Sequence, residues 1–490
     1  MLTHGGSVWT LSRGRRGEDQ VRTLQRPGRA RPCPTGVMIM GMRFRRLVLV
    51  LVSVVATGQS VKLDIAQLEA SAKEELEATK TPGAAIGVVS EGRLIYAHGF
   101  GTSNLETGAP VTSATLFRLG STTKMLTATA VAQLAAEGKL DFEDTVGKHV
   151  RGLDPSIGGL TVNQILSHTS GLKDTAVMNG RHDDAALGEE IRAWKSDWLF
   201  TKPGVIYSYA NPAYWLAGFV AESIAGKPYA DVMEERVFSA VGMASTTLRP
   251  TMAMTREFSQ GHDIVDNKVA LLRPAPDNAA NWPAGSVFSN VADLARFVTA
   301  MIDEGRLDGK QALPPKVVKA LTTPHADIPG SRSKYGYGLD LEDRGGFLVW
   351  THGGSRAGYG SFIAMLPGVH AGLIVLCNRT GENLPKMRAR IMAMLGEPLR
   401  GGVPVEEKAI PASAFGRYLG SYRNGDAAVQ IVTRAGKLFF RSMELQKGEG
   451  GWLVTKSADG RTAGRIFPVA GADGRIEYLH VGGRSSVRVE

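Results

Sequence analysis

The spacing of apolar positions changes several times along the chain, and each spacing predicts a different kind of element. Residues 63–79 (LDIAQLEASAKEELEAT) carry apolar side chains at helical spacing. Residues 83–101 (GAAIGVVSEGRLIYAHGFG) contain two apolar runs on either side of Glu91-Gly92, which predicts two strands joined by a turn. The Ala- and Leu-rich run at residues 121–140 predicts a long helix that ends near Gly138.

The centre of the chain has a mostly helical pattern interrupted by Gly and Pro. Residues 347–378 (FLVWTHGGSRAGYGSFIAMLPGVHAGLIVLCN) then return to strand-like apolar runs. Strands near both ends, with helices between them, predict an α/β (α+β) fold. We expect an antiparallel sheet that is flanked by helices and carries an inserted helical subdomain.

The last part of the chain has a different pattern. Short strand-like runs (AVQIVTR, KLFFRSM, GWLVTKS, GRIFPVA, RIEYLHV) alternate with turn-forming sequences such as Ala472-Asp473-Gly474. Strands at this spacing predict a small all-β barrel or sandwich. We therefore expect a main domain over 63–397, a linker over 398–412 and a barrel domain over 413–490.

The formal net charge of +10 is concentrated near the N-terminus. Residues 1–58 hold ten arginines and two acidic residues, which leaves 47 basic and 45 acidic residues in the rest of the chain. A body with so little excess charge gives no support for a nucleic-acid partner.

Residues 38–58 have the layout of a secretory signal peptide. Three arginines precede an apolar stretch at residues 47–56, and small residues follow it. Because this stretch is short for a bilayer, we expect export to the periplasm or medium and no stable membrane span; an uncleaved N-terminal anchor is the alternative. Residues 1–37 lie upstream of the signal and need not belong to the working protein, since several methionines between residues 38 and 42 are plausible starts.

The two cysteines, Cys33 and Cys377, predict no intramolecular disulfide, because removal of the leader leaves Cys377 alone. Cys377 ends the apolar run GLIVLC and is expected to be a small buried core residue. Export without disulfides is typical of a bacterial enzyme whose core is large enough to need no covalent cross-links.

The segment FRLGSTTKML contains the sharpest chemical pattern. Ser121 begins the predicted long helix, and Lys124 follows three residues later on the same helix face. A serine needs an adjacent base to become a nucleophile, and an enclosed lysine can have its pKa lowered enough to serve. The plainer interpretation of this segment alone is a helix-capping serine and a solvated lysine.

Two further segments strengthen the catalytic interpretation. Tyr209 and Asn211 precede a helix-like apolar run, where a tyrosine could relay the Ser121 proton and an amide could bind substrate and lysine. The plainer alternative is a buried tyrosine and a capping asparagine. In THGGSRAGYGSF, a strand presents His352 and then two glycines that let a substrate backbone approach, and the Ser355 N–H could form an oxyanion hole with that of Ser121.

Ser121-Thr-Thr-Lys124, Tyr209-Ala-Asn211 and His352-Gly-Gly354, in this order, resemble the three motifs of the class C β-lactamase and penicillin-binding-protein-like serine hydrolases. The stretches TPGAAIGVV, LFRLGSTTK, ILSHTSGL, WPAGSVFSNVADLARF and YGYGLDL are also similar, and the resemblance spans roughly residues 63–397. The tail that begins YLGSYRN is similar to the lipocalin-like β-barrel that follows this domain in some members.

The resemblance implies an acyl-enzyme mechanism with Ser121 as nucleophile, Lys124 as base and Tyr209 as proton relay. Four residues would lie on the substrate side, namely Asn211, His352, Gly354 and Ser355. The Ser121 and Ser355 N–H groups would face the oxyanion. His352 occupies the position where β-lactamases usually carry lysine, a change that is similar to some DD-peptidases and D-aminopeptidases. Because histidine is only partly charged near pH 7, this weakens the case for β-lactam recognition; Arg356 is a candidate replacement cation.

Other sites are less well supported by the sequence. An α/β-hydrolase would need G-x-S-x-G, which Gly353-Gly-Ser355-Arg-Ala357 fails at its last position, and a zinc hydrolase would need a motif such as H-E-x-x-H. His182-Asp183-Asp184 is expected to be a polar loop, and His168 to brace a turn.

The sequence therefore predicts an exported serine hydrolase that cleaves an amide or ester without a metal or organic cofactor. Its partner would be a small molecule or short peptide, and cell-wall association stays open. Esterase, D-aminopeptidase, DD-peptidase and β-lactamase activities are not separated by the sequence. The alternative is a catalytically silent binding or sensor protein on the same fold, with the barrel as a cap on the cleft or only a stabilising domain.

Overall fold

The computed structural model describes residues 63–175, 177–396, 407–457 and 460–489. The predicted leader, Cys33 and most of the predicted linker lie outside these residues. Within them, no helix has the length and apolar character needed to cross a membrane.

The larger body is built on a nine-stranded sheet whose neighbouring strands are all antiparallel. The predicted antiparallel sheet is therefore confirmed, including the turn at Glu91-Gly92. In spatial order its strands are β10 (Ala326–Asp327), β11 (Lys334–Tyr335), β12 (Asp340–Asp343), β13 (Leu348–Arg356), β14 (Tyr359–Leu366), β15 (Ala371–Cys377), β1 (Gly83–Ser90), β2 (Arg93–Asn104) and β3 (Ala109–Pro110).

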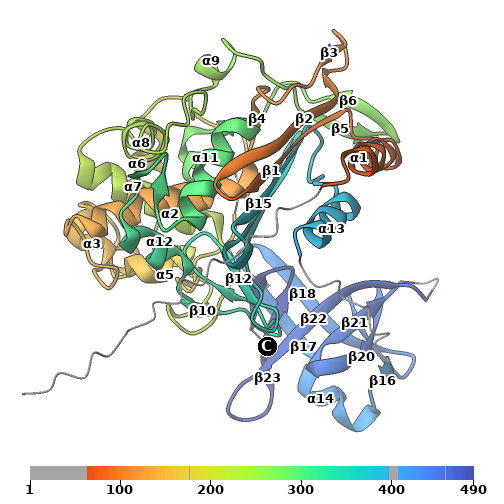
Figure 1. Ribbon diagram of the computed structural model, residues 1–490. Coiled ribbons are helices and arrows are strands. Elements are labelled where there is room, and N and C mark those ends of the chain that lie inside the picture. Colours follow the sequence, from red (N-terminus) through yellow and green to blue (C-terminus); the bar gives the residue numbers. More distant parts are fainter. Residues whose placement is uncertain (1–62, 176, 397–406, 458–459, 490) are drawn as a thin grey trace, which may run out of the picture. The chain divides into compact units, whose positions relative to one another are not determined.

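Helices cover both faces of this sheet and form a lobe beside it, as the sequence predicts (Figure 1). The α-helices are α1 (Ile65–Thr79), α2 (Thr123–Ala136), α3 (Val146–His149), α4 (Pro155–Gly158), α5 (Val162–Leu166), α6 (Ala186–Arg192), α7 (Asn211–Ala225), α8 (Tyr229–Met233), α9 (Pro250–Ala253), α10 (Trp282–Gly285), α11 (Val291–Ile302), α12 (Pro315–Thr322), α13 (Pro385–Met394) and α14 (Phe415–Tyr418). Short strand pairs join β4 (Phe117–Arg118) to β7 (Phe288–Ser289), β5 (His262–Val265) to β6 (Lys268–Leu271), and β8 (Arg306–Leu307) to β9 (Lys310–Gln311).

The central strands are buried on both faces, which explains why β1 is a continuous apolar run. Successive side chains of a strand point to opposite faces. Ile86 and Val88 therefore pack in one cluster with α1 and α13, whereas Ala85 and Val89 pack in another with α2 and α11. The predicted burial of Cys377 is confirmed, since its side chain lies inside the first of these clusters.

The predicted helix over 121–140 is replaced by two elements. A 3-10 turn, η1 (Gly120–Thr122), comes first, and α2 continues from Thr123 to Ala136. The positive φ of 57° at Gly120 explains this start, because it bends the chain immediately before Ser121. Gly138, with a φ of 72°, lies just beyond the helix end, near the predicted position.

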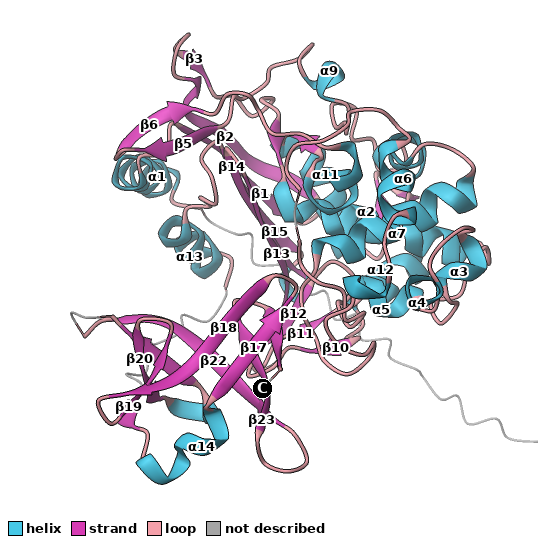
Figure 2. Cartoon of the chain, turned by 180° about the vertical axis from the view of Figure 1, so that it is seen from behind, coloured by secondary structure: helices cyan, strands magenta, loops and turns pink. Residues whose placement is uncertain are grey.

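The C-terminal strands close into the predicted barrel (Figure 2). Eight strands form it, because β20 pairs with both β19 and β21, and β16 (Lys408–Ala409) is added outside β20. The run KLFFRSM is broken by a turn at Arg441, whose φ is +59°. The apolar runs in the sequence did not predict β17, β20 and β24, whose apolar patterns are weaker. The barrel strands are β17 (Gly420–Asn424), β18 (Ala427–Arg434), β19 (Lys437–Phe440), β20 (Met443–Lys447), β21 (Leu453–Lys456), β22 (Thr462–Ala470), β23 (Ile476–Val481) and β24 (Arg484–Arg488).

Candidate active site

Ser121 lies in η1, where the chain passes close to strand β13. The space beside Gly120 is so narrow that a Cβ atom there would lie 2.8 Å from the Ser355 nitrogen. On the strand side, a Cβ on Gly354 would lie 2.0 Å from the Leu119 carbonyl oxygen. Glycine at both positions therefore lets the Ser121 backbone and the Ser355 backbone approach each other.

Lys124 is fully buried, and in the part of the chain that the structure describes its amine forms hydrogen bonds with neutral oxygen atoms alone. Its Nζ lies 3.3 Å from the Ser121 Oγ and donates to the Asn211 Oδ1 at 2.7 Å and to the Ala284 carbonyl at 2.8 Å. Burial lowers the pKa of Lys124 well below its usual value, because the charged form loses its hydration; the nearby Asp174 acts in the opposite direction. Burial of this kind therefore favours the neutral amine over the ammonium ion.

Asn211 links Lys124 to an aspartate that the sequence did not single out. The Asn211 side-chain amide donates to the Asp174 Oδ1 at 3.0 Å, and its backbone N–H donates to the same atom at 2.8 Å. Because its oxygen faces Lys124 and its nitrogen faces Asp174, the amide orientation is determined. Asn211 therefore positions Lys124 in this arrangement.

Tyr209 places a buried hydroxyl beside these groups. Among the described residues, this hydroxyl has no hydrogen-bond partner. Burial raises the pKa of Tyr209, and the nearby Ser121 side chain opposes this rise. The Lys124 Nζ lies 4.7 Å from the centre of the Tyr209 ring. An unpartnered buried hydroxyl is costly, so it is available to a substrate or to a transferring proton.

His352 is buried on β13 and is not a substitute for a lysine cation. Burial and the proximity of Lys124 lower the pKa of His352 to about 3, so the ring is neutral at physiological pH. Its Nδ1 lies 2.7 Å from the Gly353 carbonyl oxygen, and its Nε2 lies 3.3 Å from the Tyr335 hydroxyl. A proton on Nδ1 satisfies both contacts, because Nε2 then accepts from the tyrosine.

These residues surround a cavity of about 590 Å³. All the predicted substrate-side residues line it, and so do the predicted nucleophile and proton relay, while Lys124 lies below the surface of the cavity. The lining includes Ser121, Tyr207, Tyr209, Asn211, Tyr335, Asp340, His352, Gly354, Ser355, Arg356, Gly482, Gly483 and Arg484.

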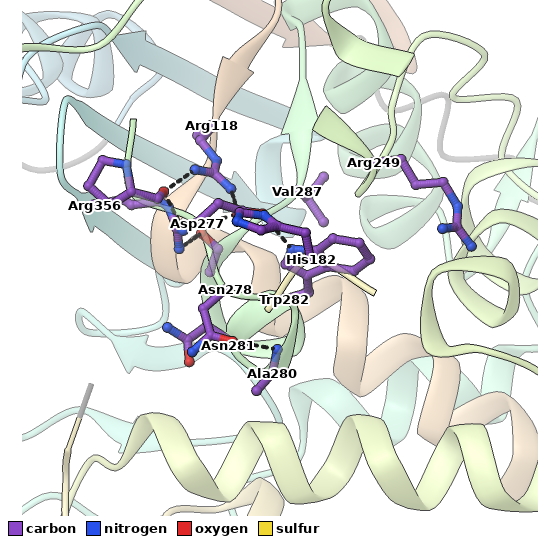
Figure 3. A network of polar contacts seen from close by, with 12 residues as sticks. Arg118, His182, Arg249, Asp277, Asn278, Ala280, Asn281, Trp282, Val287 and Arg356 are labelled. Atoms are coloured by element: carbon purple, nitrogen blue, oxygen red, sulfur yellow. Dashed lines mark hydrogen bonds and ion pairs between the residues drawn. The ribbon is translucent and has the colours of Figure 1, made fainter. Parts of the chain in front are cut away.

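Arg356 belongs to a separate buried cluster and is not an unpaired cation in the cavity (Figure 3). Its guanidinium donates to the carbonyls of Gly285 and Pro276 and lies 3.5 Å from the Asp277 carboxylate. The Arg118 guanidinium forms an ion pair with the same carboxylate. Burial acts to raise the pKa of Asp277, but the two arginines more than offset it, so this pKa is lowered.

The barrel supplies a wall of the cavity that no motif predicted. The Tyr209 N–H donates a hydrogen bond of 2.9 Å to the Gly483 carbonyl, which lies in the hairpin between β23 and β24. The next residue, Arg484, forms an ion pair with Asp174 at 2.5 Å, and its guanidinium carbon lies 5.1 Å from the Tyr209 ring centre. The barrel therefore contacts both the tyrosine and the aspartate that positions Asn211.

Two histidines that the sequence treated as structural have structural contacts. The His168 Nδ1 accepts from the Ala210 N–H at 3.1 Å and so braces the segment that carries Tyr209. The His182 Nδ1 lies 3.1 Å from the Asp277 carboxylate, at the edge of the arginine cluster. Among the described residues, no group of three His, Cys, Asp or Glu side chains is arranged to hold a metal ion.

Asp340, on β12, is the most notable lining residue that the motifs missed. Its carboxyl has no cationic partner among the described residues, and burial raises its pKa to about 7. Both Asp340 and Tyr335 lie in the stretch YGYGLDL, so the sequence held a signal for this wall without indicating which side chains face the cavity.

Comparison with known proteins gives a consistent family. A family model described as Beta-lactamase matches residues 68–395. Protein flp from Staphylococcus aureus (strain MW2) is 24% identical over 330 residues, which cover 66% of this chain and 64% of that protein. The chain thus spans less than two thirds of the length of this relative. A D-aminopeptidase from Gluconobacter oxydans (strain 621H) is 27% identical over 410 residues, which cover 80% of this chain and 75% of the relative.

Solved structures agree on the fold. The crystal structure of SurE has 25% sequence identity and a TM-score of 0.72, with 86% of this chain and 99% of that chain covered. The Beta-Lactamase/D-Alanine Carboxypeptidase from Pseudomonas syringae has 20% identity and a TM-score of 0.58, with 69% and 99% covered. The second likeness concerns the fold alone.

Proposed function

The chain belongs to the Beta-lactamase family, and from that premise we propose that it hydrolyses an amide or ester through an acyl-enzyme on Ser121. The family resemblance expected from the three motifs is confirmed, and the family is one of serine hydrolases. The observation that carries the proposal is the Lys124 Nζ, which lies 3.3 Å from the Ser121 Oγ and, among the described residues, contacts no carboxylate.

The proposed reaction assigns a step to each group. Neutral Lys124 accepts the Ser121 proton while the Oγ attacks the substrate carbonyl carbon. The Ser121 and Ser355 N–H groups stabilise the resulting oxyanion. The bond to the leaving amine or alkoxide breaks, and the proton on Lys124 passes to that leaving group through the Tyr209 hydroxyl. Water then attacks the acyl-enzyme, which releases the acid and restores Ser121.

We further propose a preference for substrates that carry a free amine. Arg356 and Arg484 are each paired with an aspartate, whereas the Asp340 carboxyl lines the cavity and has no cationic partner within the described part of the chain. A substrate ammonium group would supply the missing charge and favour the ionised carboxylate. The similarity to a D-aminopeptidase supports this preference over a β-lactam, whose recognition usually needs a cation.

A substrate panel on wild type and variants tests both proposals. We expect turnover of D-Ala-p-nitroanilide to exceed that of its N-acetyl form and of nitrocefin, with p-nitrophenyl acetate as a small ester without an amine. Ser121→Ala should remove all turnover while far-ultraviolet circular dichroism stays unchanged; retained activity would rule out the acyl-enzyme. Asp340→Asn should raise KM for D-Ala-p-nitroanilide and leave p-nitrophenyl acetate unaffected.

Asp343→Asn is the matched control, because this residue ends the same strand in an exposed position. If Asp340→Asn affects both substrates equally, the amine preference is wrong and the acyl-enzyme mechanism stands. The catalytically silent alternative predicts that a fluorophosphonate probe leaves Ser121 of the wild type unlabelled.

Export and domain organisation remain proposals that rest on the sequence pattern. The layout of residues 38–58 supports secretion or a periplasmic location, with N-terminal anchoring as the alternative. Mass spectrometry of the mature N-terminus checks this, because cleavage by a signal peptidase would remove the apolar stretch. A periplasmic or secreted location would allow cell-wall association, which pull-down with purified peptidoglycan tests.

A further inference from the structure

The Asp174–Arg484 ion pair joins two distant parts of the chain next to the proposed base. Asp174 lies between α5 and α6 of the larger body, whereas Arg484 is the first residue of the last barrel strand, β24. The Asp174 Oδ2 accepts from the Arg484 Nε at 2.5 Å, and the Oδ1 accepts from both N–H groups of Asn211. The Asn211 Oδ1 in turn accepts from the Lys124 Nζ. A continuous series of polar contacts therefore runs from the barrel to the Lys124 amine.

The position of Arg484 is determined by the residues on either side of it. The two residues before it are glycines with φ values of 56° and 82°, a left-handed conformation that favours glycine. The second of them, Gly483, accepts from the Tyr209 N–H, and the next residue, Ser485, donates through its Oγ to the Tyr207 carbonyl at 2.9 Å. Because both neighbours are bonded to the segment that carries Tyr209, the hairpin holds the guanidinium beside the aspartate.

Charge near the Lys124 amine comes mainly from this ion pair. The titratable side chains near the amine in the described structure are Tyr209, Tyr214, His168, His352, Asp174 and Arg484. Burial raises the pKa of both tyrosines and lowers the pKa of both histidines, so these four groups are neutral near pH 7. Burial is also the main cause of the lowered pKa of Lys124; Asp174 acts against this change and Arg484 acts with it.

We infer that Arg484 is a positioning residue for hydrolysis, because it balances the charge of Asp174 and lets this aspartate orient Asn211 without stabilising the ammonium form of Lys124. An unpaired carboxylate at the same place would favour the ammonium form, which cannot accept the Ser121 proton. The inference rests on the proposed function, in which neutral Lys124 is the base. It makes the barrel a working part of the hydrolytic centre.

Titration of the Lys124 amine by NMR tests this role without any need for turnover. The full-length protein is labelled with lysine carrying ¹³C at Cε, and the Lys124 signal is identified by its absence in Lys124→Met. Arg484→Met should raise the titration midpoint by about 0.5–1 pH unit, because it leaves Asp174 without a counter-charge. Arg484→Lys should keep most of the wild-type midpoint. Arg475→Met is the matched control, since this barrel arginine is exposed beside Asp473 and should leave the midpoint unchanged.

The pH dependence of kcat/KM gives a second readout. The acid limb of Arg484→Met should move to higher pH by the same amount, which is about three- to tenfold in kcat/KM at a fixed pH on that limb. The shift should appear with D-Ala-p-nitroanilide and with p-nitrophenyl acetate. A direct contact between Arg484 and one substrate would instead raise KM for that substrate and leave the limb in place. Asp174→Asn combined with Arg484→Met removes both charges and should return the limb close to its wild-type position.

Three results would overturn the inference. The first is an unchanged or lowered Lys124 midpoint in Arg484→Met, and the second is an equal shift in Arg475→Met. The third is a fall in kcat at every pH with limb and midpoint in place, which would mean that Arg484 only maintains the hairpin. Failure of the proposed function is distinguishable, because turnover retained in Ser121→Ala would remove the acyl-enzyme while the NMR midpoint still reports on Arg484.

Discussion

Lys124 and Arg118 are two buried cationic side chains on either side of Ser121, and their partners differ in kind. The Arg118 side chain is paired with the Asp277 carboxylate, which a second arginine and a histidine also contact. The Lys124 amine contacts a hydroxyl, an amide oxygen and a carbonyl oxygen. Both residues are nearly inaccessible to solvent, so the difference does not come from exposure.

We propose that this difference separates a structural charge from a reactive one. A buried charge whose counter-charge is fixed beside it stays ionised and holds segments together. A buried amine with only neutral acceptors gives up its proton readily, because burial penalises the ammonium form. We therefore expect substitution in the arginine cluster to lower stability and substitution of Lys124 to lower activity.

The largest effect is expected from Lys124→Met. Loss of the base should reduce kcat by about 10³–10⁴-fold, the upper part of the range for general-base catalysis. The free energy of unfolding should change by less than about 2 kcal/mol, because the lost hydrogen bonds are offset by removal of a costly buried amine. Steady-state kinetics and urea unfolding measure the two quantities. The exposed Lys139→Met is the control, and a stability loss as large as that of Asp277→Asn would contradict the comparison.

The next effect is expected in stability at the arginine cluster. Asp277→Asn leaves Arg118 and Arg356 buried without a counter-charge and should lower the free energy of unfolding by about 3–5 kcal/mol. Asp183→Asn, which removes a solvent-exposed partner of Arg181, should cost less than about 1 kcal/mol. Urea denaturation followed by tryptophan fluorescence compares them. Equal losses of unfolding free energy in the two variants would show that the buried Arg118–Asp277 pair stabilises the fold no more than the exposed pair does.

A smaller effect is expected at Tyr209. Tyr209→Phe removes the hydroxyl that would carry the proton to the leaving group, so kcat should fall about 100-fold. Tyr337→Phe provides a control, because this tyrosine is buried but bonds to Asn163 outside the cavity lining. Substrates with an activated leaving group, such as p-nitrophenyl esters, need less protonation and should be affected least. An unchanged kcat on D-Ala-p-nitroanilide would remove Tyr209 from the proton path.

The smallest effect is a shift in the pH profile. Lys124 must be neutral to act as a base, so kcat/KM should fall as pH drops below the lysine's lowered pKa, by about tenfold per pH unit. Asp174 raises the pKa of Lys124 and Arg484 lowers it. Asp174→Asn should therefore move the acid limb to lower pH. A limb that stays in place, or moves to higher pH, would mean that another group controls it.

Much of the fold follows from local patterns in the sequence. The two-face burial of β1 and β15 produces continuous apolar runs, and the barrel hairpins carry glycine turns, so both regions are predictable. The long-helix prediction missed η1, because the bend depends on a positive φ at Gly120 beside a distant strand. Strands β17 and β24 were missed because many of their side chains are polar and their pairing is set by the closed barrel.

The candidate site shows the same division. Ser121, Lys124, Tyr209 and Asn211 lie in recognisable motifs, and the structure brings them together at one cavity. Asp174, Asp340 and Arg484 were not predicted, because each acquires its position through contacts between segments far apart in the chain. The expectation of a partly charged His352 changes as well, since complete burial beside Lys124 holds it neutral.

The hairpin at Gly482–Arg484 also has a consequence for the order in which the molecule is made. A ribosome delivers Ser121 and Lys124 before this wall of the cavity, which follows more than 350 residues later in the chain. The hydrogen bond from the Tyr209 N–H to Gly483 and the Arg484–Asp174 pair form only after that point. A nascent chain therefore carries an incomplete cavity while the residues between Lys124 and the hairpin are made, and the finished lining arrives with the closing strands of the barrel.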